Sequence, residues 1–217
     1  MNKIIFFWLL VTSVVCPATG KASTLPNQGE NTPVRTASHM PAMAMAEIGS
    51  LAPFFTLDAV VNQEFKKISL SDYRGKWVVL FFYPGDFTFV CPTEIRGFNK
   101  SLADFAKINT AVLAVSVDSK FSHMAWIKSG ALDKLELPLL SDFSKQTARA
   151  YGVLDEVQSS ARRGLFIIDP SGVIQHMLVH NDKVGRSVEE TLRVLKALQT
   201  QELCPINWKP GDKTIKR

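Results

Sequence analysis

Cysteine is scarce in this chain of 217 residues, which holds only Cys16, Cys91 and Cys204. Three cysteines exclude a disulfide-rich scaffold, and none of them is spaced as the C-x-x-C pair of a dithiol redox centre. The histidines are few and dispersed, and none is grouped with a cysteine at metal-ligand spacing. We therefore expect no metal and no other cofactor. The histidines are interpreted as surface residues or hydrogen-bonded core residues: His39, His123, His176 and His180.

The excess of positive over negative charge is also small. The chain has 25 Lys and Arg against 20 Asp and Glu, a net charge of +5. These charges are interleaved, and only the final segment "KPGDKTIKR" is dense in basic residues. Because no patch of interleaved aromatic and basic residues is present, we expect no nucleic-acid partner. The hydrophobic content of 46% excludes a disordered chain and is typical of a globular domain.

Long hydrophobic runs are limited to one, at 4–16, which follows Lys3 and precedes small residues. At about 1.5 Å per helical residue this run spans about 20 Å, less than the ~30 Å hydrocarbon core, so no stable membrane span is expected. The pattern is typical of a secretory signal, and we assign 1–22 to a signal or targeting peptide. The predicted location is exported or periplasmic. Organelle targeting and a cytoplasmic location remain alternatives.

The rest of the chain divides into a linker and one domain. Cys16, the last residue of the apolar run, is either an apolar filler of the signal or a lipidation site. Residues 23–45 are rich in Pro, Ser, Thr and Asn without apolar periodicity, which predicts a flexible linker. A single domain is predicted over 46–217, a length that can bury a sizeable core.

Strands and helices alternate within this domain. Three apolar runs rich in β-formers predict strands at 77–83, 111–118 and 165–172, and the first is apolar enough to be covered on both faces. The turn Pro170-Ser171-Gly172 then leads into 173–179, which predicts a hairpin. Helices are predicted after Cys91, at 141–152 and at 186–198. This alternation favours an α/β sandwich with a central mixed β-sheet flanked by helices.

The predicted helices carry distinct sequence signals. Ile95, Phe98, Leu102 and Phe105 fall on one helical face. The helix at 141–152 is expected to begin at a capping residue and to end at a glycine. The helix at 186–198 begins with a capping box, in which Ser187 and Glu190 cap each other, and then shows a stripe of apolar residues. That stripe consists of Val188, Leu192 and Leu195.

The segment "FFYPGDFTFVCPTE" at 81–94 joins the end of a buried strand to the start of a helix. Pro92 is favoured at the first helical position, which places Cys91 at or near the N-cap. Unpaired backbone N–H groups and the positive end of the helix dipole favour a thiolate there, and a thiolate is the reactive nucleophile. Pro84 can shield that sulfur from water, and the Thr88 hydroxyl can bond a polar substrate atom. The alternative is a small buried hydrophobe.

This segment, together with "VSVDSKFSHMAW", "RRGLFIID", "VGRSVEETLR" and "CPINWKPG", resembles the peroxiredoxins. The resemblance runs from about residue 48 to residue 213. It is closest to the typical two-cysteine group, which includes thioredoxin peroxidases and the peroxidatic subunit of alkyl hydroperoxide reductase. It implies a thioredoxin-like fold and a peroxidase that needs no metal, haem or flavin.

The resemblance also implies roles for single residues. Cys91 resembles the peroxidatic cysteine, and Cys204 resembles the resolving cysteine, which in this group belongs to the other chain of a dimer. Thr88 and Pro84 match the active-site pair of the motif. Catalysis would pass through a sulfenic acid on Cys91 and an intersubunit disulfide between Cys91 and Cys204.

Three charged residues complete the implied site. Arg163 falls where the family has the arginine that steadies the thiolate and polarises the peroxide, whereas its neighbour Arg162 is expected to be solvated. Glu94 and Arg186 match a polar network that orients Arg163. Ordinary surface charges are the alternative for these two residues.

The implied function is reduction of hydrogen peroxide and organic hydroperoxides, with thioredoxin or a similar dithiol as the reductant. A homodimer is implied, and rings of five dimers are common in the family, so dimer and decamer both remain open. The rival function is a holdase chaperone or peroxide-signalling protein on the same fold.

Overall fold

The structure is a computed structural model that describes residues 45–216. The predicted signal or targeting peptide at 1–22, Cys16 and the predicted linker up to residue 44 lie outside the described residues. Within 45–216, no helix is both long and apolar enough to cross a membrane.

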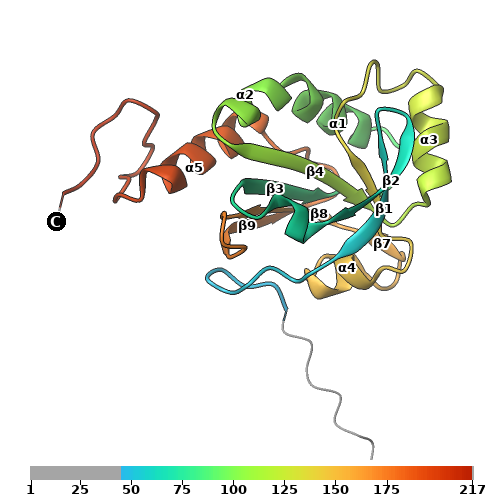
Figure 1. The fold of residues 1–217 in the computed structure, drawn as a ribbon, viewed down its shortest axis with the longest axis horizontal. Helices are drawn as coiled ribbons and strands as arrows, with labels where there is room; N and C mark the ends of the chain where they lie inside the picture. The colour runs from blue at the N-terminus through green and yellow to red at the C-terminus, as the bar shows by residue number, and fades with distance from the viewer. Residues whose placement is uncertain (1–44, 217) are drawn as a thin grey trace, which may run out of the picture. The chain divides into compact units, whose positions relative to one another are not determined.

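The centre of the domain is a seven-stranded sheet with the order β2-β1-β5-β4-β3-β8-β9 (Figure 1). Strands β3, β4 and β5 run parallel, and every other neighbouring pair is antiparallel. The strands are β1 Thr56–Val61, β2 Glu64–Ser69, β3 Trp77–Phe82, β4 Thr110–Ser116, β5 Leu139–Ser141, β8 Arg163–Ile168 and β9 Ile174–His180. A separate two-stranded ribbon pairs β6, Leu154–Asp155, with β7, Ser160–Ala161. The predicted mixed sheet is confirmed.

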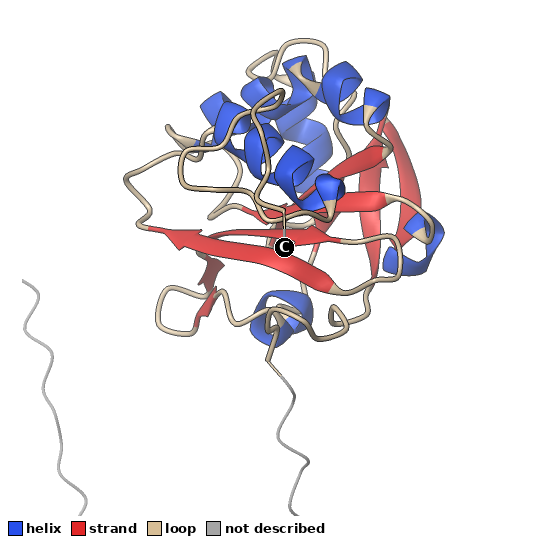
Figure 2. Ribbon diagram, turned by 90° about the vertical axis from the view of Figure 1, so that its left-hand side faces the viewer, coloured by secondary structure: helices blue, strands red, loops and turns tan. Residues whose placement is uncertain are grey.

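Most helices cover one face of the sheet, whereas α4 covers the other (Figure 2). The helices are α1 Cys91–Lys100, α2 Leu102–Lys107, α3 Lys120–Lys128, α4 Gln146–Ala150 and α5 Val188–Thr200, with a 3₁₀ turn η1 at Leu70–Tyr73. Because β3 is covered on both sides, five of its six residues are buried. Alternate residues of β3 therefore enter two separate apolar clusters, one on each face.

The predicted hairpin is confirmed, because β8 and β9 pair antiparallel around a tight turn. The predicted strand at 165–172 starts two residues earlier, at Arg163, and stops at Ile168. The stretch after it is that turn, in which Asp169 accepts backbone bonds from Ser171 and Val173. The helix predicted after Cys91 is broken at Ser101 into α1 and α2. Both parts still bury the predicted face, with Ile95, Phe98 and Phe105 fully buried and Leu102 partly buried.

Two predicted helix starts need correction. Ser141 ends β5, and α4 begins only at Gln146. The Asp142 carboxylate, which accepts the backbone N–H of Thr147 at 3.2 Å and of Ala148 at 2.6 Å, binds the free donors of that helix. The predicted glycine end holds, since Gly152 follows α4 in a left-handed conformation at φ 68°.

The second correction concerns α5. Only half of its predicted capping box forms. The Ser187 hydroxyl accepts the Glu190 N–H at 3.1 Å, but the Glu190 carboxylate turns to Arg193. An ion pair along the helix thus replaces the return bond to Ser187.

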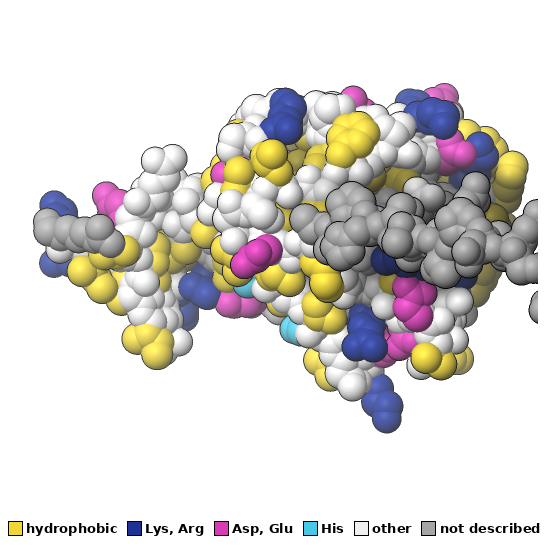
Figure 3. Space-filling view, turned by 90° about the horizontal axis from the view of Figure 1, so that it is seen from below, with side chains coloured by type: hydrophobic (Ala, Val, Ile, Leu, Met, Phe, Trp, Pro, Cys, Tyr) yellow, Lys and Arg dark blue, Asp and Glu magenta, His cyan; other side chains and the backbone are white. Residues whose placement is uncertain are grey.

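The segment after α5 folds back on itself as a short tail. The backbone N–H of Ile215 donates to the carbonyl of Leu203, and the Trp208 side chain is 4% exposed. By contrast Leu203, Ile206 and Ile215 are 44–90% exposed. Figure 3 shows this tail at the left, with hydrophobic side chains on its surface. The tail therefore presents an apolar surface next to Cys204.

Phe98 tests the packing of α1 on the sheet. Its ring stacks on Phe81 at 4.5 Å and on Phe105 at 6.1 Å, and it is fully buried. Phe98→Ala should lower the free energy of unfolding in urea by about 3–5 kcal/mol because a large apolar side chain leaves a cavity. The matched control is Phe143→Ala, which removes a ring that is 72% exposed and should change stability by less than ~0.5 kcal/mol. Equal losses in both variants would contradict this packing.

Candidate active site

Cys91 lies where the buried central strand passes into α1. The structure makes Cys91 the first residue of α1 and Val90 its N-cap, with Pro92 in the first turn, so Cys91 lies near the N-cap as predicted. Its side chain is completely buried. The sulfur therefore lies at the N-terminal end of a helix, where backbone N–H groups and the helix dipole favour negative charge.

Arg163 reaches this sulfur from β8, the strand next to β3. Its Nη1 lies 3.4 Å from Cys91 Sγ and donates to it. The same nitrogen donates to Glu94 Oε2 at 2.5 Å, and Nε donates to the Asp182 carbonyl at 2.9 Å. The guanidinium is thus fixed on two sides and carries its positive charge against the sulfur.

Glu94 is the buried anion that holds two arginines together. One turn after Cys91, it is only 4% exposed. Its carboxylate accepts from the Arg186 backbone N–H at 2.8 Å, from Arg186 Nε at 2.7 Å and from Arg186 Nη2 at 2.9 Å. Arg186 also donates to the carbonyls of Phe82 and Gly164, which ties the network to β3 and β8. The predicted network of Glu94, Arg163 and Arg186 is therefore assembled around one carboxylate.

The electrostatics of this network follow from its pairing. Burial alone would raise the pKa of Glu94, but the hydrogen bonds and charge of Arg186, with the charge of Arg163, hold that pKa below its ordinary value. Burial would lower the pKa of Arg163, yet the hydrogen bond to the Cys91 sulfur and the charge of Glu94 raise it above its ordinary value. Both partners are therefore fully charged at neutral pH.

Pro84 and Thr88 lie on the loop that leads to Cys91. Pro84 is half-buried and follows the end of β3, whereas Thr88 is exposed. The Thr88 hydroxyl donates to the Gly85 carbonyl at 2.9 Å, which leaves its oxygen free to accept a further hydrogen bond. Arg162, as expected, is exposed and pairs only loosely with Asp155.

One part of the site was missed by sequence reasoning. Asp86 on the same loop accepts from the Tyr83 hydroxyl at 2.9 Å and from Ser122 at 2.7 Å, and lies 2.8 Å from Nδ1 of the fully buried His123. These bonds fasten the loop to α3. The position of Asp86 within the cysteine motif could have marked it as a site residue. Its partners on α3 could not be found from the sequence, because they lie 36 and 37 residues away.

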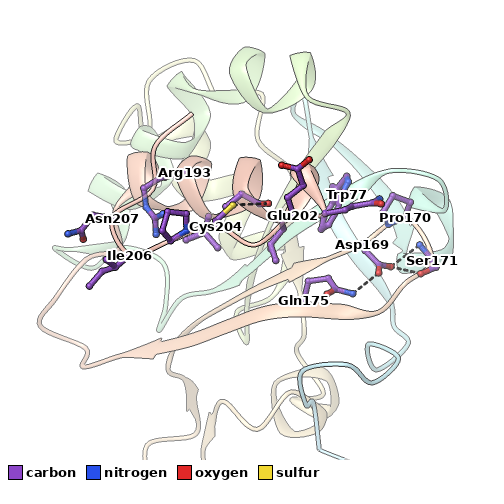
Figure 4. Close-up of a pocket in the computed structure, with 15 residues that line it drawn as sticks. Trp77, Asp169, Pro170, Ser171, Gln175, Arg193, Glu202, Cys204, Ile206 and Asn207 are labelled. Carbon is purple, nitrogen blue, oxygen red and sulfur yellow. Dashed lines mark hydrogen bonds between the residues drawn. The ribbon is translucent and has the colours of Figure 1, made fainter. Parts of the chain in front are cut away.

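Cys204 lies in the tail, beside the C-terminal end of α5. Its sulfur lines a cavity of about 900 Å³ together with Trp77, Asp169 and Arg193 (Figure 4). Trp77 is the first residue of β3, whereas Cys91 follows the far end of that strand. The six residues of β3 span about 17 Å, and the two thiols of one chain lie toward opposite ends of this strand. Both cysteines are free.

The described residues 45–216 contain no group of three or more His, Cys, Asp or Glu side chains that could hold a metal ion. His123 is fully buried and its ring nitrogens bond Asp86 and the Leu140 carbonyl, as expected for a core histidine. His180 differs, because its buried Nδ1 has no hydrogen-bond partner among the described residues.

A buried cysteine at the start of a helix, placed after a central strand of a mixed sheet, defines a thioredoxin-like thiol protein. The chain belongs to the AhpC/TSA family, whose model matches residues 48–177. The predicted peroxiredoxin resemblance and the thioredoxin-like α/β fold are confirmed.

Known relatives agree in sequence and in structure. A chloroplastic 2-Cys peroxiredoxin of Spinacia oleracea is 54% identical over 178 residues, which cover 78% of this chain and 67% of that protein. The mitochondrial thioredoxin-dependent peroxide reductase of Homo sapiens is 49% identical and covers 95% of this chain and 79% of its own length. A reduced Plasmodium vivax 2-Cys peroxiredoxin has a TM-score of 0.74 at 40% identity and covers 78% of this chain and 92% of its own.

Glu94→Gln tests the network through stability. Removing the anion leaves two buried guanidinium groups without their partner, which should cost about 3–5 kcal/mol at pH 7. The pKa of Glu94 is lowered in the folded protein, so its stabilisation is complete above the unfolded value of about 4.3 and is lost as the pH falls below it. The stability gap between the natural protein and the variant should therefore narrow below about pH 4 in urea titrations.

The matched control is Glu156→Gln, which removes an exposed carboxylate that also pairs with an arginine. It should change stability little at any pH. A gap for Glu94→Gln that stayed the same from pH 7 to pH 3 would contradict the assigned ion pairing.

Proposed function

We propose that the chain reduces hydrogen peroxide and organic hydroperoxides through Cys91, as a thiol peroxidase of the two-cysteine type. The observation that carries this proposal is the Arg163 guanidinium, 3.4 Å from a cysteine sulfur at a helix N-terminus. A buried cationic donor and a helix end both stabilise a thiolate. The two relatives cited above are named 2-Cys peroxiredoxin and thioredoxin-dependent peroxide reductase.

In the first step, the Cys91 thiolate attacks one oxygen of the peroxide ROOH. A sulfur–oxygen bond forms, the oxygen–oxygen bond breaks, and the leaving alkoxide takes a proton to become the alcohol ROH. Arg163 and the N–H groups at the start of α1 stabilise the developing negative charge. The Thr88 oxygen is free to accept a hydrogen bond from the peroxide, and Pro84 limits the access of water.

In the second step, the sulfenic acid on Cys91 has to become accessible. Cys91 is completely buried, and Glu94 anchors the same helical turn, so the first turn of α1 must unwind to release the sulfur. A second thiol can then form a disulfide with it. Exchange with an external dithiol such as thioredoxin restores both thiols.

The second thiol is Cys204 of another copy of the chain. Disulfide geometry requires Cα atoms within about 7 Å, whereas the two thiols of one chain lie toward opposite ends of β3, a strand about 17 Å long. The exposed apolar side chains of the tail, Leu203, Ile206 and Ile215, favour docking on a partner surface. A homodimer with two Cys91–Cys204 bonds follows.

A larger ring remains compatible with the surface near Cys91. Phe87 and Phe89 on the active-site loop are 59% and 95% exposed. Lys120 on α3 lies 5.6 Å from the rings of both Phe65, on the edge strand β2, and Phe121, on α3. Such exposed aromatic groups suit contacts between dimers, as a decamer of five dimers requires. A holdase function would use the same surfaces but needs none of the network around Glu94, so peroxidase activity is favoured.

The compartment is inferred from the relatives. Two of the cited relatives are named for the chloroplast and for the mitochondrion. The match to the mitochondrial relative covers 95% of the chain, so it reaches into residues 1–44. Organelle targeting, the alternative from the sequence, is therefore favoured over export. Organelle targeting also suits a thioredoxin-type reductant better than an oxidising exported compartment.

Thr88→Val tests the role of the loop hydroxyl. The change removes one hydroxyl at nearly constant volume, and the exposed site should leave the fold intact. We expect kcat/KM for hydrogen peroxide to fall by at least tenfold, about 1.4 kcal/mol of lost transition-state stabilisation. Thr93→Val, which alters an exposed hydroxyl in the first turn of α1, is the control. A Thr88→Val value within about threefold of the natural protein would exclude contact with the transition state.

Peroxide treatment tests the proposed function as a whole. It should convert the reduced protein into a covalent dimer on non-reducing gels. Cys91→Ser should abolish both the dimer and peroxide consumption. Cys204→Ser should abolish the dimer and turnover with thioredoxin, yet still allow one peroxide to react per site. Peptide mapping that found the Cys91–Cys204 bond within one chain would refute the two-chain arrangement.

A further inference from the structure

The basic segment at the end of the chain has no part in the chemistry described above. After Cys204 the sequence has four basic residues and only one acid. The first three of these basic residues lie within the described part of the chain and are exposed: Lys209, Lys213 and Lys216. None of the three takes part in an ion pair within residues 45–216. Their charges therefore face any molecule that approaches the tail.

The fold of the tail brings these charges close to the thiol. The backbone N–H of Ile215 donates to the Leu203 carbonyl at 2.8 Å, so the two ends of the tail lie side by side. Lys216 accordingly lines one surface hollow together with Leu203, the residue before Cys204. Figure 3 shows Lys and Arg side chains at the outer left end of the tail, beside its hydrophobic side chains. Cys204 and the basic groups thus belong to one compact unit.

The two acids of the tail are turned toward the tail itself. The Asp212 carboxylate accepts the Lys209 backbone N–H at 2.8 Å, and the Glu202 carboxylate accepts the Thr214 hydroxyl. On the neighbouring helix α5, Glu190 is paired with Arg193. These carboxylates therefore hold the local structure together, and the lysines give the outer surface of the tail its positive charge.

The proposed mechanism requires another protein to come to this surface. The Cys91–Cys204 disulfide has to meet an external dithiol, and one of its sulfurs belongs to the tail. In the proposed dimer the exposed apolar side chains of the tail face the partner subunit, which leaves the lysines for the reductant. A surface of one sign steers a partner of the opposite sign and raises its association rate by about 10- to 1,000-fold at low salt.

We propose that the basic tail is the docking surface for the reductant, and that this reductant is a protein with acidic residues around its dithiol. The proposal rests on the proposed function, because it names the partner of that second thiol. One thiolate of the reductant attacks the Cys204 sulfur, a bond to the reductant forms, and the Cys91–Cys204 bond breaks. Cys91 leaves as a thiolate. The second thiolate of the reductant then attacks the first sulfur, which releases Cys204 as a thiol and the reductant as a disulfide.

The direct test uses two short peptides with the same C-x-x-C dithiol, flanked by glutamates in one peptide and by lysines in the other. Each is added to the full chain as its peroxide-treated covalent dimer, and loss of the dimer is timed on non-reducing gels. At about 20 mM salt the acidic peptide should react at least tenfold faster. At about 1 M salt, where the screening length is only about 3 Å, the two rates should agree within about twofold.

Charge reversal in the tail should invert this preference. The variant carries Lys209→Glu, Lys213→Glu and Lys216→Glu, and at low salt it should react faster with the basic peptide. The corresponding triple change to Gln should react with both peptides within about twofold, because the attraction is lost without new repulsion. Dithiothreitol, which has no fixed charge, should reduce both variants within about threefold of the natural rate.

The control variant changes the net charge by the same amount elsewhere. It carries Lys66→Glu, Lys128→Glu and Lys134→Glu, three exposed lysines outside the tail. Figure 1 shows β2 and α3, which hold the first two, on the side of the domain opposite to the tail. This variant should keep the preference of the natural protein for the acidic peptide. An equal loss of preference in both Glu variants, or no preference in the natural protein at low salt, would overturn the proposal.

A binding measurement separates this proposal from the proposed function. The same peptides, with both cysteines changed to serine and a fluorescent label, are titrated onto the reduced full chain and followed by fluorescence anisotropy. At low salt the acidic peptide should bind at least tenfold more tightly than the basic one, and only the tail variants should lose this difference. If the natural protein formed no disulfide with peroxide, the proposed function would fail, whereas equal binding of the two peptides would overturn the docking surface alone.

Discussion

The buried carboxylate of Glu94 is the interaction on which the rest of the site depends. It is bound by Arg186 through three N–H groups and by Arg163 through one. A buried carboxylate is costly unless it is paired and hydrogen-bonded, and here both conditions are met. Because Glu94 belongs to the same turn as Cys91, it places the Arg163 guanidinium against the sulfur. Arg186 in turn ties that turn to the carbonyls of Phe82 and Gly164.

The same constraint sets the conformational cost of catalysis. Cys91 is fully buried, so in the proposed mechanism the bonds that hold Arg163 against the sulfur also hold the helical turn that has to open. The second thiol is in the opposite situation, since Cys204 lies at the C-terminal end of a helix and on a partly exposed tail. One cysteine is therefore buried at the start of a helix, while the other lies partly exposed beside the end of a helix.

Sequence reasoning predicted the elements that depend on local pattern. The apolar run of β3, the β8–β9 hairpin and the buried face of α1 and α2 all follow from periodicity and turn residues. The residues of the site followed from resemblance to a family, whose motifs placed Glu94, Arg163 and Arg186 together. The geometry at the sulfur did not follow from either source, because it depends on bonds from Glu94 on α1 to Arg163 and Arg186, which lie 69 and 92 residues away in the chain.

The failures share one physical cause. The start of α4 was wrong because the Asp142 side chain caps the helix from outside the expected position. In the predicted capping box of α5 the bond from Glu190 back to Ser187 is missing, because the Glu190 carboxylate pairs with Arg193 instead. The loop contacts of Asp86 with Ser122 and His123 were missed because α3 comes from a distant part of the sequence. In each case a polar side chain bonds a partner other than the one that the sequence signal predicts.

The central claim is that Arg186 holds the Glu94 carboxylate in place, and that Glu94 in turn holds the Arg163 guanidinium against the Cys91 sulfur. The most direct measurement is the stopped-flow rate constant for hydrogen peroxide with reduced Arg186→Lys, whose altered residue makes no hydrogen bond to the sulfur. A displaced guanidinium at the reacting centre should slow that step about 100-fold while circular dichroism shows a native fold. The control, Arg162→Lys, changes an exposed neighbour of Arg163 and should react at the natural rate. A folded Arg186→Lys protein with the natural rate constant would contradict the account.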